Sequence, residues 1–138
     1  MKILITGVAG FAGITICEKL IKQNPGLQII GIDNFSRPGS ETNLKKLKKL
    51  DVPVYRVDIR LASDIESLQP VDWVIDCAAN PSVLAGLDGQ SSSRQVMEHN
   101  LLGTINLLEY CKKHKAGLIL LSTSRVYSAS ELAFLPMQ

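Results

Sequence analysis

The chain has 138 residues, about the length of one domain, and its 46% hydrophobic and 20% charged residues suit a globular core. A formal net charge of +2 indicates no polyanionic partner, so nucleic-acid binding is not expected. Cys17, Cys77 and Cys111 lie far apart, without a Cys-x-x-Cys or His/Cys cluster, so neither a disulfide framework nor a metal site is indicated, and a cytoplasmic setting is expected. No unbroken apolar run approaches the ~20 residues of a membrane span.

An apolar, strand-like run at the start of the chain leads directly into a glycine-rich turn and a helix. Residues 3–5 form the run, and Gly7, Gly10 and Gly13 follow at three-residue spacing. This arrangement brings backbone N–H groups to a helix N-terminus, where a pyrophosphate anion can bind. The glycines would allow the tight turn, the approach of the phosphate and close packing of the helix on the strand. A signal peptide is the alternative interpretation of residues 1–16, and the interrupting glycines argue against it.

A second strand-like run, residues 27–32, ends at Asp33, twenty positions beyond Gly13. A carboxylate at this strand end can accept both ribose hydroxyls of an adenosine, and it would repel a 2′-phosphate. Asp33 therefore favours NAD over NADP. Arg37 lies close enough to leave NADP open as an alternative.

The rest of the chain alternates between helix and strand. We expect helices over about 11–23, 41–50, 64–68 and 94–114, and further strands over about 52–57, 71–77 and 117–121. The alternation predicts an α/β fold: a Rossmann-type, doubly wound parallel sheet of five strands in the order 3-2-1-4-5, in a single domain over residues 1–138.

Two of the expected helices carry a mixture of apolar and polar faces. The helix over 41–50 turns Leu44 and Leu47 inward among four lysines; a solvated helix face is favoured over a nucleic-acid patch because no aromatic residues are interleaved. The helix over 94–114 is apolar on more than one side. One face carries Met97, Leu101, Thr104, Leu108 and Cys111, and Leu102 and Ile105 extend it to another. Such a helix needs a second partner, so we expect it also to pack against another subunit.

Candidate ligand contacts lie at strand ends and on the long helix. Ala78 follows the fourth strand, where a small side chain suits either a flat ligand or tight core packing. Asn100 is either a hydrogen-bonding group of the cofactor region or a surface residue. Ser122 follows the fifth strand, and hydroxyls there point into the crevice where open α/β sheets bind ligands. His99 and His114 are most simply surface histidines.

Several motifs recur together along the chain. They are T-G-V-A-G-F-A-G at 6–13, D-N-F-S-R at 33–37, D-I-R at 58–60, N-L-L-G-T-I-N-L-L-E at 100–109 and S-T-S-R-V-Y at 122–127. In combination they resemble the extended short-chain dehydrogenase/reductases, the family of nucleotide-sugar epimerases and dehydratases. The resemblance covers the chain from residue 1 to about residue 128.

The resemblance implies an NAD site whose residues hold successive parts of the cofactor. The residues assigned to it are Gly7, Gly10, Phe11 and Ala12 for the pyrophosphate, with Gly13 in the same turn; Asp33 and Asn34 for the ribose, with Ser36 and Arg37 nearby; Asp58 and Ile59 for the adenine; Ala78, Ala79 and Asn100 toward the nicotinamide; and Ser122 at the end of the fifth strand. Many relatives have His where Asp76 stands, which weakens the detailed correspondence at that strand end.

The resemblance also implies a catalytic role for Thr123, whose hydroxyl would hydrogen-bond the sugar oxygen that is oxidised. The family's base is a Tyr with a Lys four residues later. Tyr127 is followed at that distance by Glu131, so Tyr127 is not that base. We therefore expect the Tyr/Lys pair, the sixth strand and the substrate domain beyond Gln138, and we interpret the chain as the N-terminal part of a longer enzyme, inactive alone.

The two residues after Thr123 reduce the number of candidate reactions. The family's 4,6-dehydratases place Asp and Glu there, whereas this chain has Ser124 and Arg125, so water elimination lacks its general acid. Residues 33–44 and 122–127 look most like the CDP-paratose (CDP-tyvelose) 2-epimerases, in which bound NAD oxidises and re-reduces carbon 2 of the sugar. A UDP-sugar 4-epimerase, a dehydratase or a decarboxylase of the same family, or a non-catalytic NAD-binding module, are the alternatives. The implied partners are a nucleotide sugar and a second copy of the chain, bound through the 94–114 helix.

Overall fold

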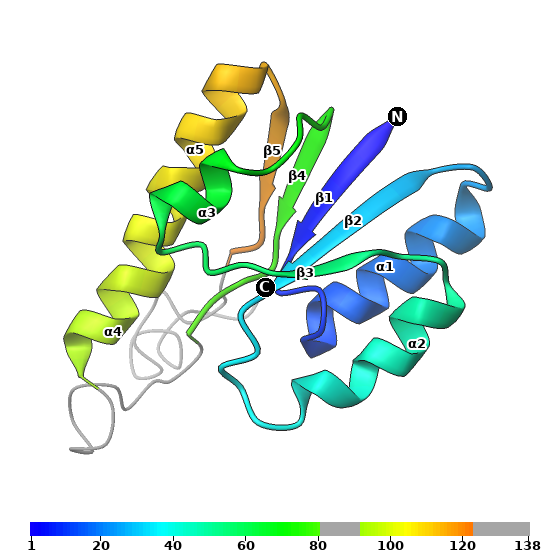
Figure 1. The fold of residues 1–138 in the computed structure, drawn as a ribbon, viewed down its shortest axis with the longest axis horizontal. Coiled ribbons are helices and arrows are strands. Elements are labelled where there is room, and N and C mark those ends of the chain that lie inside the picture. The colour runs from blue at the N-terminus through cyan, green and yellow to red at the C-terminus, as the bar shows by residue number, and fades with distance from the viewer. Residues whose placement is uncertain (81–91, 123–138) are drawn as a thin grey trace, which may run out of the picture.

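The computed structural model describes residues 1–80 and 92–122 (Figure 1). Within them, one parallel sheet has the order β3-β2-β1-β4-β5, which confirms the predicted topology. The strands are β1 (Lys2–Thr6), β2 (Gln28–Asp33), β3 (Val54–Arg56), β4 (Trp73–Asp76) and β5 (Gly117–Leu120). From β1 the chain adds β2 and β3 on one side of this strand, and it then adds β4 and β5 on the other side. The direction of the connections therefore switches between β1 and β4.

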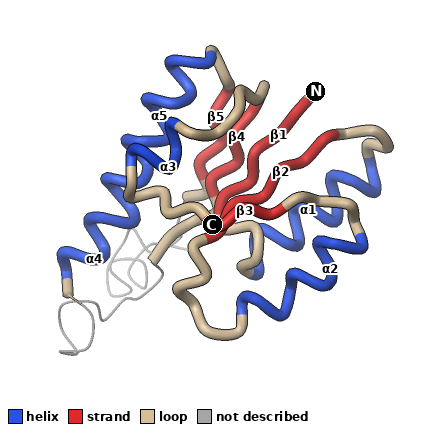
Figure 2. The backbone as a smooth tube through the Cα atoms, viewed as in Figure 1, coloured by secondary structure: helices blue, strands red, loops and turns tan. Residues whose placement is uncertain are grey.

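Helices cover both faces of the sheet, as Figures 1 and 2 show. One face carries α1 (Phe11–Gln23) and α2 (Leu44–Lys49), which is preceded by the 3₁₀ turn η1 (Ser40–Asn43). The other carries α3 (Ala62–Glu66) and α5 (Gly103–His114). The predicted 94–114 helix is α4 (Ser93–Met97), the π-helical turn η2 (Glu98–Leu102) and α5 in direct succession. Among the described residues, no helix is both long and apolar enough to cross a membrane.

The core consists of two apolar layers, one on each face of the sheet. Successive residues of β1 point to opposite faces, so Ile3 and Ile5 pack beneath α1 and α2 while Leu4 packs on the α3 and α5 side. Burial of each such side chain contributes about 1.5–3 kcal/mol to stability. The central strand β1 is therefore anchored from both faces, and its carboxyl end has a fixed position for the turn that follows.

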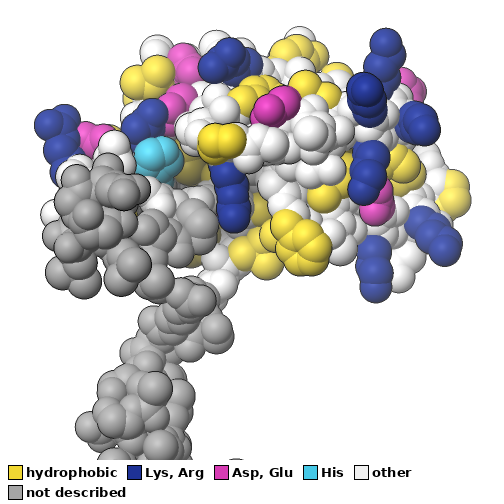
Figure 3. Space-filling view, turned by 90° about the horizontal axis from the view of Figure 1, so that it is seen from below, with side chains coloured by type: hydrophobic (Ala, Val, Ile, Leu, Met, Phe, Trp, Pro, Cys, Tyr) yellow, Lys and Arg dark blue, Asp and Glu magenta, His cyan; other side chains and the backbone are white. Residues whose placement is uncertain are grey.

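The start of the second helix differs from the prediction. Leu47 is fully buried as expected, but Leu44 is 37% exposed and does not face the core. Residues 40–43 form a 3₁₀ turn, whose tighter winding changes the face that the following residue presents. The four lysines of this segment are exposed. Figure 3 shows basic side chains gathered at the end of the molecule where α1 and α2 lie.

The long helix uses a different face against the sheet from the expected one. Its buried residues in α5 are Gly103, Leu107, Tyr110 and Cys111. Of the predicted apolar face, only Cys111 is buried. The remaining large apolar side chains are exposed: Met97, Leu101, Leu102, Ile105 and Leu108. The helix is thus apolar on two sides, as predicted, and the large side chains of one of these sides are exposed.

Candidate functional site

A cavity of about 330 Å³ opens at the carboxyl ends of the central strands. Figure 3 views the molecule from this edge of the sheet. The lining residues come from the turn after β1, the loop after β2, the segments after β3 and β4, and the turn η2: Gly7, Gly10, Phe11, Ala12, Ile32, Asp33, Asn34, Ser36, Arg37, Ser40, Val57, Ile59, Cys77, Ala78, Ala79 and His99. This is the topological switch point, where open α/β sheets bind ligands.

The glycine turn after β1 brings three backbone segments into close contact. Gly7 has a φ of +57°, a left-handed conformation that glycine adopts without strain. The Gly10 N–H donates to the Gly7 carbonyl oxygen at 2.9 Å. A Cβ on Gly13 would lie 2.3 Å from that same oxygen, so α1 packs directly on the turn. Gly13 therefore acts through packing and does not itself line the cavity.

The N-terminus of α1 offers backbone N–H groups to the cavity. Its N-cap is Gly10, which has no side chain, and no acidic residue lies in the first turn. The intrahelical ladder begins only where the Ile14 N–H donates to the Gly10 carbonyl (3.0 Å), so the first-turn N–H groups of Phe11 and Ala12 precede it. The Phe11 side chain is 86% exposed. These uncompensated donors and the positive end of the helix dipole fit a pyrophosphate group.

Asp33 is held at the tip of β2 by the backbone around it. Its Oδ2 accepts a hydrogen bond from the Ala9 N–H (3.0 Å), and its Oδ1 accepts one from the Phe35 N–H (2.9 Å). Each carboxylate oxygen retains a lone pair that can accept a hydroxyl proton. The Asn43 amide donates to the Ala9 carbonyl at 2.8 Å, which fixes the glycine turn to η1. The geometry thus fits the predicted ribose contact.

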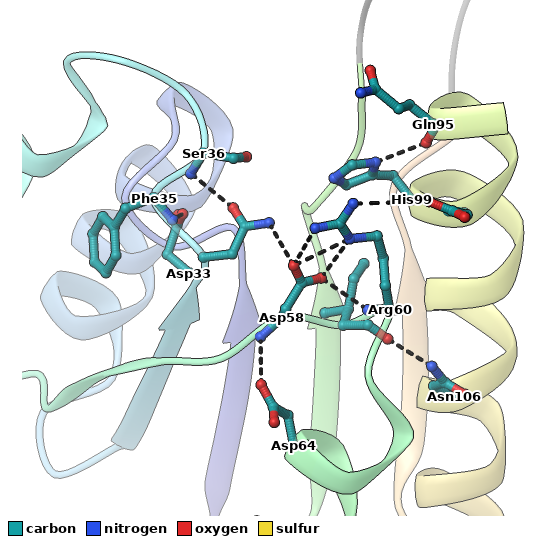
Figure 4. A network of polar contacts seen from close by, with 12 residues as sticks. Asp33, Phe35, Ser36, Asp58, Arg60, Asp64, Gln95, His99 and Asn106 are labelled. Carbon is teal, nitrogen blue, oxygen red and sulfur yellow. Dashed lines mark hydrogen bonds and ion pairs between the residues drawn. The ribbon is translucent and has the colours of Figure 1, made fainter. Parts of the chain in front are cut away.

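The carboxylate of Asp58, the predicted adenine contact, is hydrogen-bonded to Arg60 (Figure 4). The Arg60 Nη2 donates to Asp58 Oδ2 at 2.6 Å, the Arg60 Nε and backbone N–H donate to Oδ1 at 2.9 and 3.0 Å, and the Asn34 amide donates to Oδ2 at 3.3 Å. The hydrogen bond from Arg60 lowers the pKa of Asp58 to about 2. Asp58 borders a neighbouring hollow rather than the cavity, whereas Ile59 lines the cavity itself.

The π-helical turn η2 places two adjacent residues toward the end of β4. The Asn100 Oδ1 accepts the Asn80 N–H (2.8 Å), and its Nδ2 donates to the Asn80 carbonyl (3.1 Å). Asn100 therefore fixes the segment after β4. His99 is half-buried and lines the cavity, a location that its interpretation as a surface histidine did not specify. His114 is half-buried and lies against the Tyr110 ring, with 4.6 Å between ring centroids.

Thr6 and Asp76 form a buried pair beneath the cavity, on neighbouring strands. The Thr6 hydroxyl donates to Asp76 Oδ1 and accepts the backbone N–H groups of Cys77 and Ala78, each at 3.1 Å. Asp76 is 2% exposed, and its Oδ2 has no hydrogen-bond partner among the described residues. Burial raises the pKa of the Asp76 carboxyl and raises that of the neighbouring Cys77 thiol to about 12.

Most of the predicted cofactor residues meet at this cavity. Those that line it are Gly7, Gly10, Phe11, Ala12, Asp33, Asn34, Ser36, Arg37, Ile59, Ala78 and Ala79. Gly13, Asp58 and Asn100 support it from outside, and Ser122 is exposed beyond β5. Thr123 lies outside the described residues. The sequence interpretation missed five lining residues: Ile32, Ser40, Val57, Cys77 and His99. For His99, the available signal was its position directly before Asn100. No group of three or more metal-ligating residues occurs within residues 1–80 and 92–122.

The chain is similar to known nucleotide-sugar enzymes. A sequence profile described as the NAD dependent epimerase/dehydratase family matches residues 3–135. An uncharacterized UDP-glucose epimerase, YtcB of Bacillus subtilis, is 36% identical over 95% of this chain and 42% of its own length. The CDP-paratose 2-epimerase of Salmonella typhi is 31% identical over 95% of this chain and 39% of its own length.

A solved structure shares the fold as well. A variant of UDP-glucuronic acid 4-epimerase from Bacillus cereus, in complex with UDP-4-deoxy-4-fluoro-glucuronic acid and NAD, superposes with a TM-score of 0.78 at 36% identity. The match covers 93% of this chain and 42% of that protein. The chain thus spans about two fifths of the length of the relatives it matches.

Replacement of the buried acid tests the Thr6–Asp76 pair. Because the folded state raises the pKa of Asp76, the native protein holds this proton at pH values where the unfolded chain has lost it, so stability falls as the pH rises above the unfolded value of 3.8. Asp76→Asn retains the Oδ1 acceptor and removes the titration. We expect the melting temperature of Asp76→Asn relative to wild type to increase as the pH rises above 3.8 and to level off above the pKa of Asp76 in the folded state.

The control is Asp51→Asn, at an exposed position with a φ of +55° that Asn tolerates. The difference in melting temperature between Asp51→Asn and wild type should stay constant over the same pH range. A pH-independent difference for Asp76→Asn would show that Asp76 is ionised in the native state throughout.

Proposed function

The chain belongs to the NAD dependent epimerase/dehydratase family, and from this premise we propose that it is the N-terminal, NAD-binding part of a nucleotide-sugar epimerase. The observation that carries the proposal is the convergence of the α1 N-terminus and the Asp33 carboxylate on one cavity. NAD is the cofactor of the family. When bound, it accepts a hydride from the sugar and returns it.

The residues of this chain have separate roles toward NAD in the proposal. The N–H groups of Phe11 and Ala12 bind the pyrophosphate, and Gly7 and Gly10 allow it to approach. Asp33 accepts the hydroxyls of the adenosine ribose, with Asn34, Ser36 and Arg37 around it. Ala78 and Ala79 border the route toward the nicotinamide, and their small side chains leave room for a flat ring. Ser122 lies at the next strand end.

The proposed reaction is an epimerisation like that of CDP-paratose 2-epimerase. Thr123 would donate a hydrogen bond to the sugar oxygen as it becomes a carbonyl oxygen. Ser124 and Arg125 supply no general acid for the loss of water, which disfavours a dehydratase. The relatives of similar identity include 4-epimerases, a dehydratase and decarboxylases, so a UDP-sugar 4-epimerase is the second candidate. The family's Tyr/Lys pair would lie outside these 138 residues.

The exposed apolar face of the long helix supports a homodimer. Leu101 and Leu108 are each 49% exposed, and Met97, Leu102 and Ile105 continue the same surface. A contiguous apolar surface of this kind is typical of a protein interface. We place the second copy of the chain here. Cys17, Cys77 and Cys111 are all free thiols, which supports a reducing compartment such as the cytoplasm.

The ribose contact is tested by Asp33→Asn in the full-length protein. Asn retains an acceptor for only one of the two backbone N–H groups, and it loses the negative charge. We expect NAD affinity to fall about 10- to 100-fold, the equivalent of one charge-assisted hydrogen bond, while NADP affinity falls less or rises. Calorimetric titration with both cofactors measures this. The control is Glu41→Gln, which replaces an exposed carboxylate nearby. An unchanged NAD/NADP preference in Asp33→Asn would show that Asp33 does not bind the ribose.

The reaction is tested with a CDP-sugar labelled with deuterium at carbon 2. Transient oxidation by bound NAD predicts epimerisation with retention of the label and without net production of NADH. Thr123→Val should lower kcat at least 100-fold, the usual effect of losing a hydrogen bond to a developing oxyanion. Ser93→Ala, at the exposed start of α4, is the control.

Two other outcomes of the activity measurements would favour two of the alternative functions. Inversion of a UDP-sugar at carbon 4, with no activity on the CDP-sugar, would identify the 4-epimerase. NAD binding without turnover of any nucleotide sugar would indicate a non-catalytic module.

The dimer is tested by placing charge on the apolar face. Leu101→Lys combined with Ile105→Lys should convert a dimer to a monomer in light scattering, because two charges would be buried without partners. Lys112→Ala, on the exposed polar side of α5, should leave the dimer intact. A wild-type protein that is monomeric at micromolar concentration would contradict the assignment.

A further inference from the structure

We propose that the outer edge of β3, together with α2, binds an acidic, extended segment of a partner protein by strand addition. This inference goes beyond the proposed function, because no residue of α2 or β3 lines the cavity. It follows from three features of the structure: the unpaired edge of β3, the lysines beside this edge, and the different character of its two faces.

β3 is an edge strand of the sheet. Within the described residues it is hydrogen-bonded to β2 alone. The Pro53 carbonyl accepts the Gly31 N–H at 2.9 Å, so the backbone at Pro53 faces β2. Because the backbone groups of successive residues alternate in direction along a strand, the N–H and carbonyl groups of Val54 and Arg56 face outward. An extended peptide can pair with these groups and continue the sheet.

A positively charged surface borders this edge. Residues 44–56 contain four exposed lysines and a single acidic residue, Asp51. The lysines are Lys45, Lys46, Lys48 and Lys49, all in α2. None of them forms an ion pair within residues 1–80 and 92–122. Figure 3 shows that basic side chains gather at this end of the molecule. Such a surface favours a negatively charged partner and steers its approach.

The two faces of the edge differ in character. Val54 packs on the core layer beneath α1 and α2, so Tyr55 projects to the opposite face of the sheet, where it is 53% exposed. On the α2 side, Lys48 and the partly exposed Leu44 border a hollow next to the start of β3. An added strand would therefore place alternate side chains near lysines on one face and near an aromatic ring on the other.

These features together define the chemistry of the partner. Carboxylates at every second position would meet the lysines, and β-branched side chains between them would pack on Tyr55. A membrane surface and a nucleic acid fit less well, because neither offers strand-like backbone groups to the edge of β3. The partner is thus a peptide segment in which acidic and β-branched residues alternate.

The test uses a capped decapeptide in which glutamate and valine alternate, and fluorescence anisotropy measures its binding to the full-length protein. A second peptide has glutamine in place of every glutamate. A third peptide carries methyl groups on two consecutive central backbone nitrogens, which removes a hydrogen-bond donor from each of its edges. Vesicles of phosphatidylcholine and phosphatidylserine, mixed three to one, represent an anionic membrane.

We expect the acidic peptide to bind, and the glutamine and methylated peptides to bind at least about 10-fold more weakly. Lys45→Gln combined with Lys48→Gln should weaken binding of the acidic peptide about 3- to 10-fold, because two charge contacts are lost. Lys112→Gln combined with Lys113→Gln, at exposed positions in α5, is the matched control and should leave binding unchanged. Asp51 also borders the hollow and would repel the peptide, so Asp51→Asn should strengthen binding about 2-fold.

The inference would be overturned if the acidic peptide did not bind, or if the glutamine or methylated peptide bound equally well. Binding of the vesicles without binding of the acidic peptide would also overturn it, and would identify the surface as a membrane contact. The NAD affinity of the variants with two lysines replaced should equal that of wild type. A failure of this inference therefore leaves the proposed function intact.

Discussion

The site depends on the close contact between α1 and the turn after β1. The Gly7 carbonyl oxygen receives the Gly10 N–H on one side and leaves no room for a side chain on Gly13 on the other. This contact aims the first-turn N–H groups of α1 at the switch point of the sheet, because the helix can approach the strand so closely only without a Cβ. The binding surface for an anion is therefore made by the backbone, and the side chain of Phe11 points into solvent.

Two carboxylates at neighbouring strand ends differ in their hydrogen bonding because their surroundings differ. Within the described residues, Asp33 accepts only backbone N–H groups and keeps lone pairs free. Asp58 is paired with the guanidinium of Arg60, which lowers its pKa and uses its acceptor capacity in holding the molecule together. A third acid, Asp76, lies beneath the cavity, where it positions the backbone after β4 through the Thr6 hydroxyl. Proximity to the cavity thus does not by itself assign an acid to ligand binding.

The sheet order, α1 and most of the cavity lining were predictable, because they follow from strand–helix alternation, glycine spacing and the motif that ends at Asp33. What the sequence did not reveal depends on contacts between distant segments or on unusual winding. Leu44 is exposed because a 3₁₀ turn precedes it, and His99 reaches the cavity because a π-helical turn lies within an otherwise regular helix. No period in the sequence marks either turn. The saturation of Asp58 depends on Arg60 folding back on it, which a motif of three adjacent residues does not disclose.

The surroundings of Cys77 make the cavity wall chemically unreactive. Burial and the adjacent Asp76 raise the pKa of its thiol to about 12, so the sulfur is almost entirely protonated at physiological pH. Because only a thiolate attacks electrophiles or peroxides at an appreciable rate, the raised pKa slows alkylation and oxidation of Cys77, although Cys77 lines the cavity. A thiol-directed reagent would therefore label this cavity poorly at neutral pH.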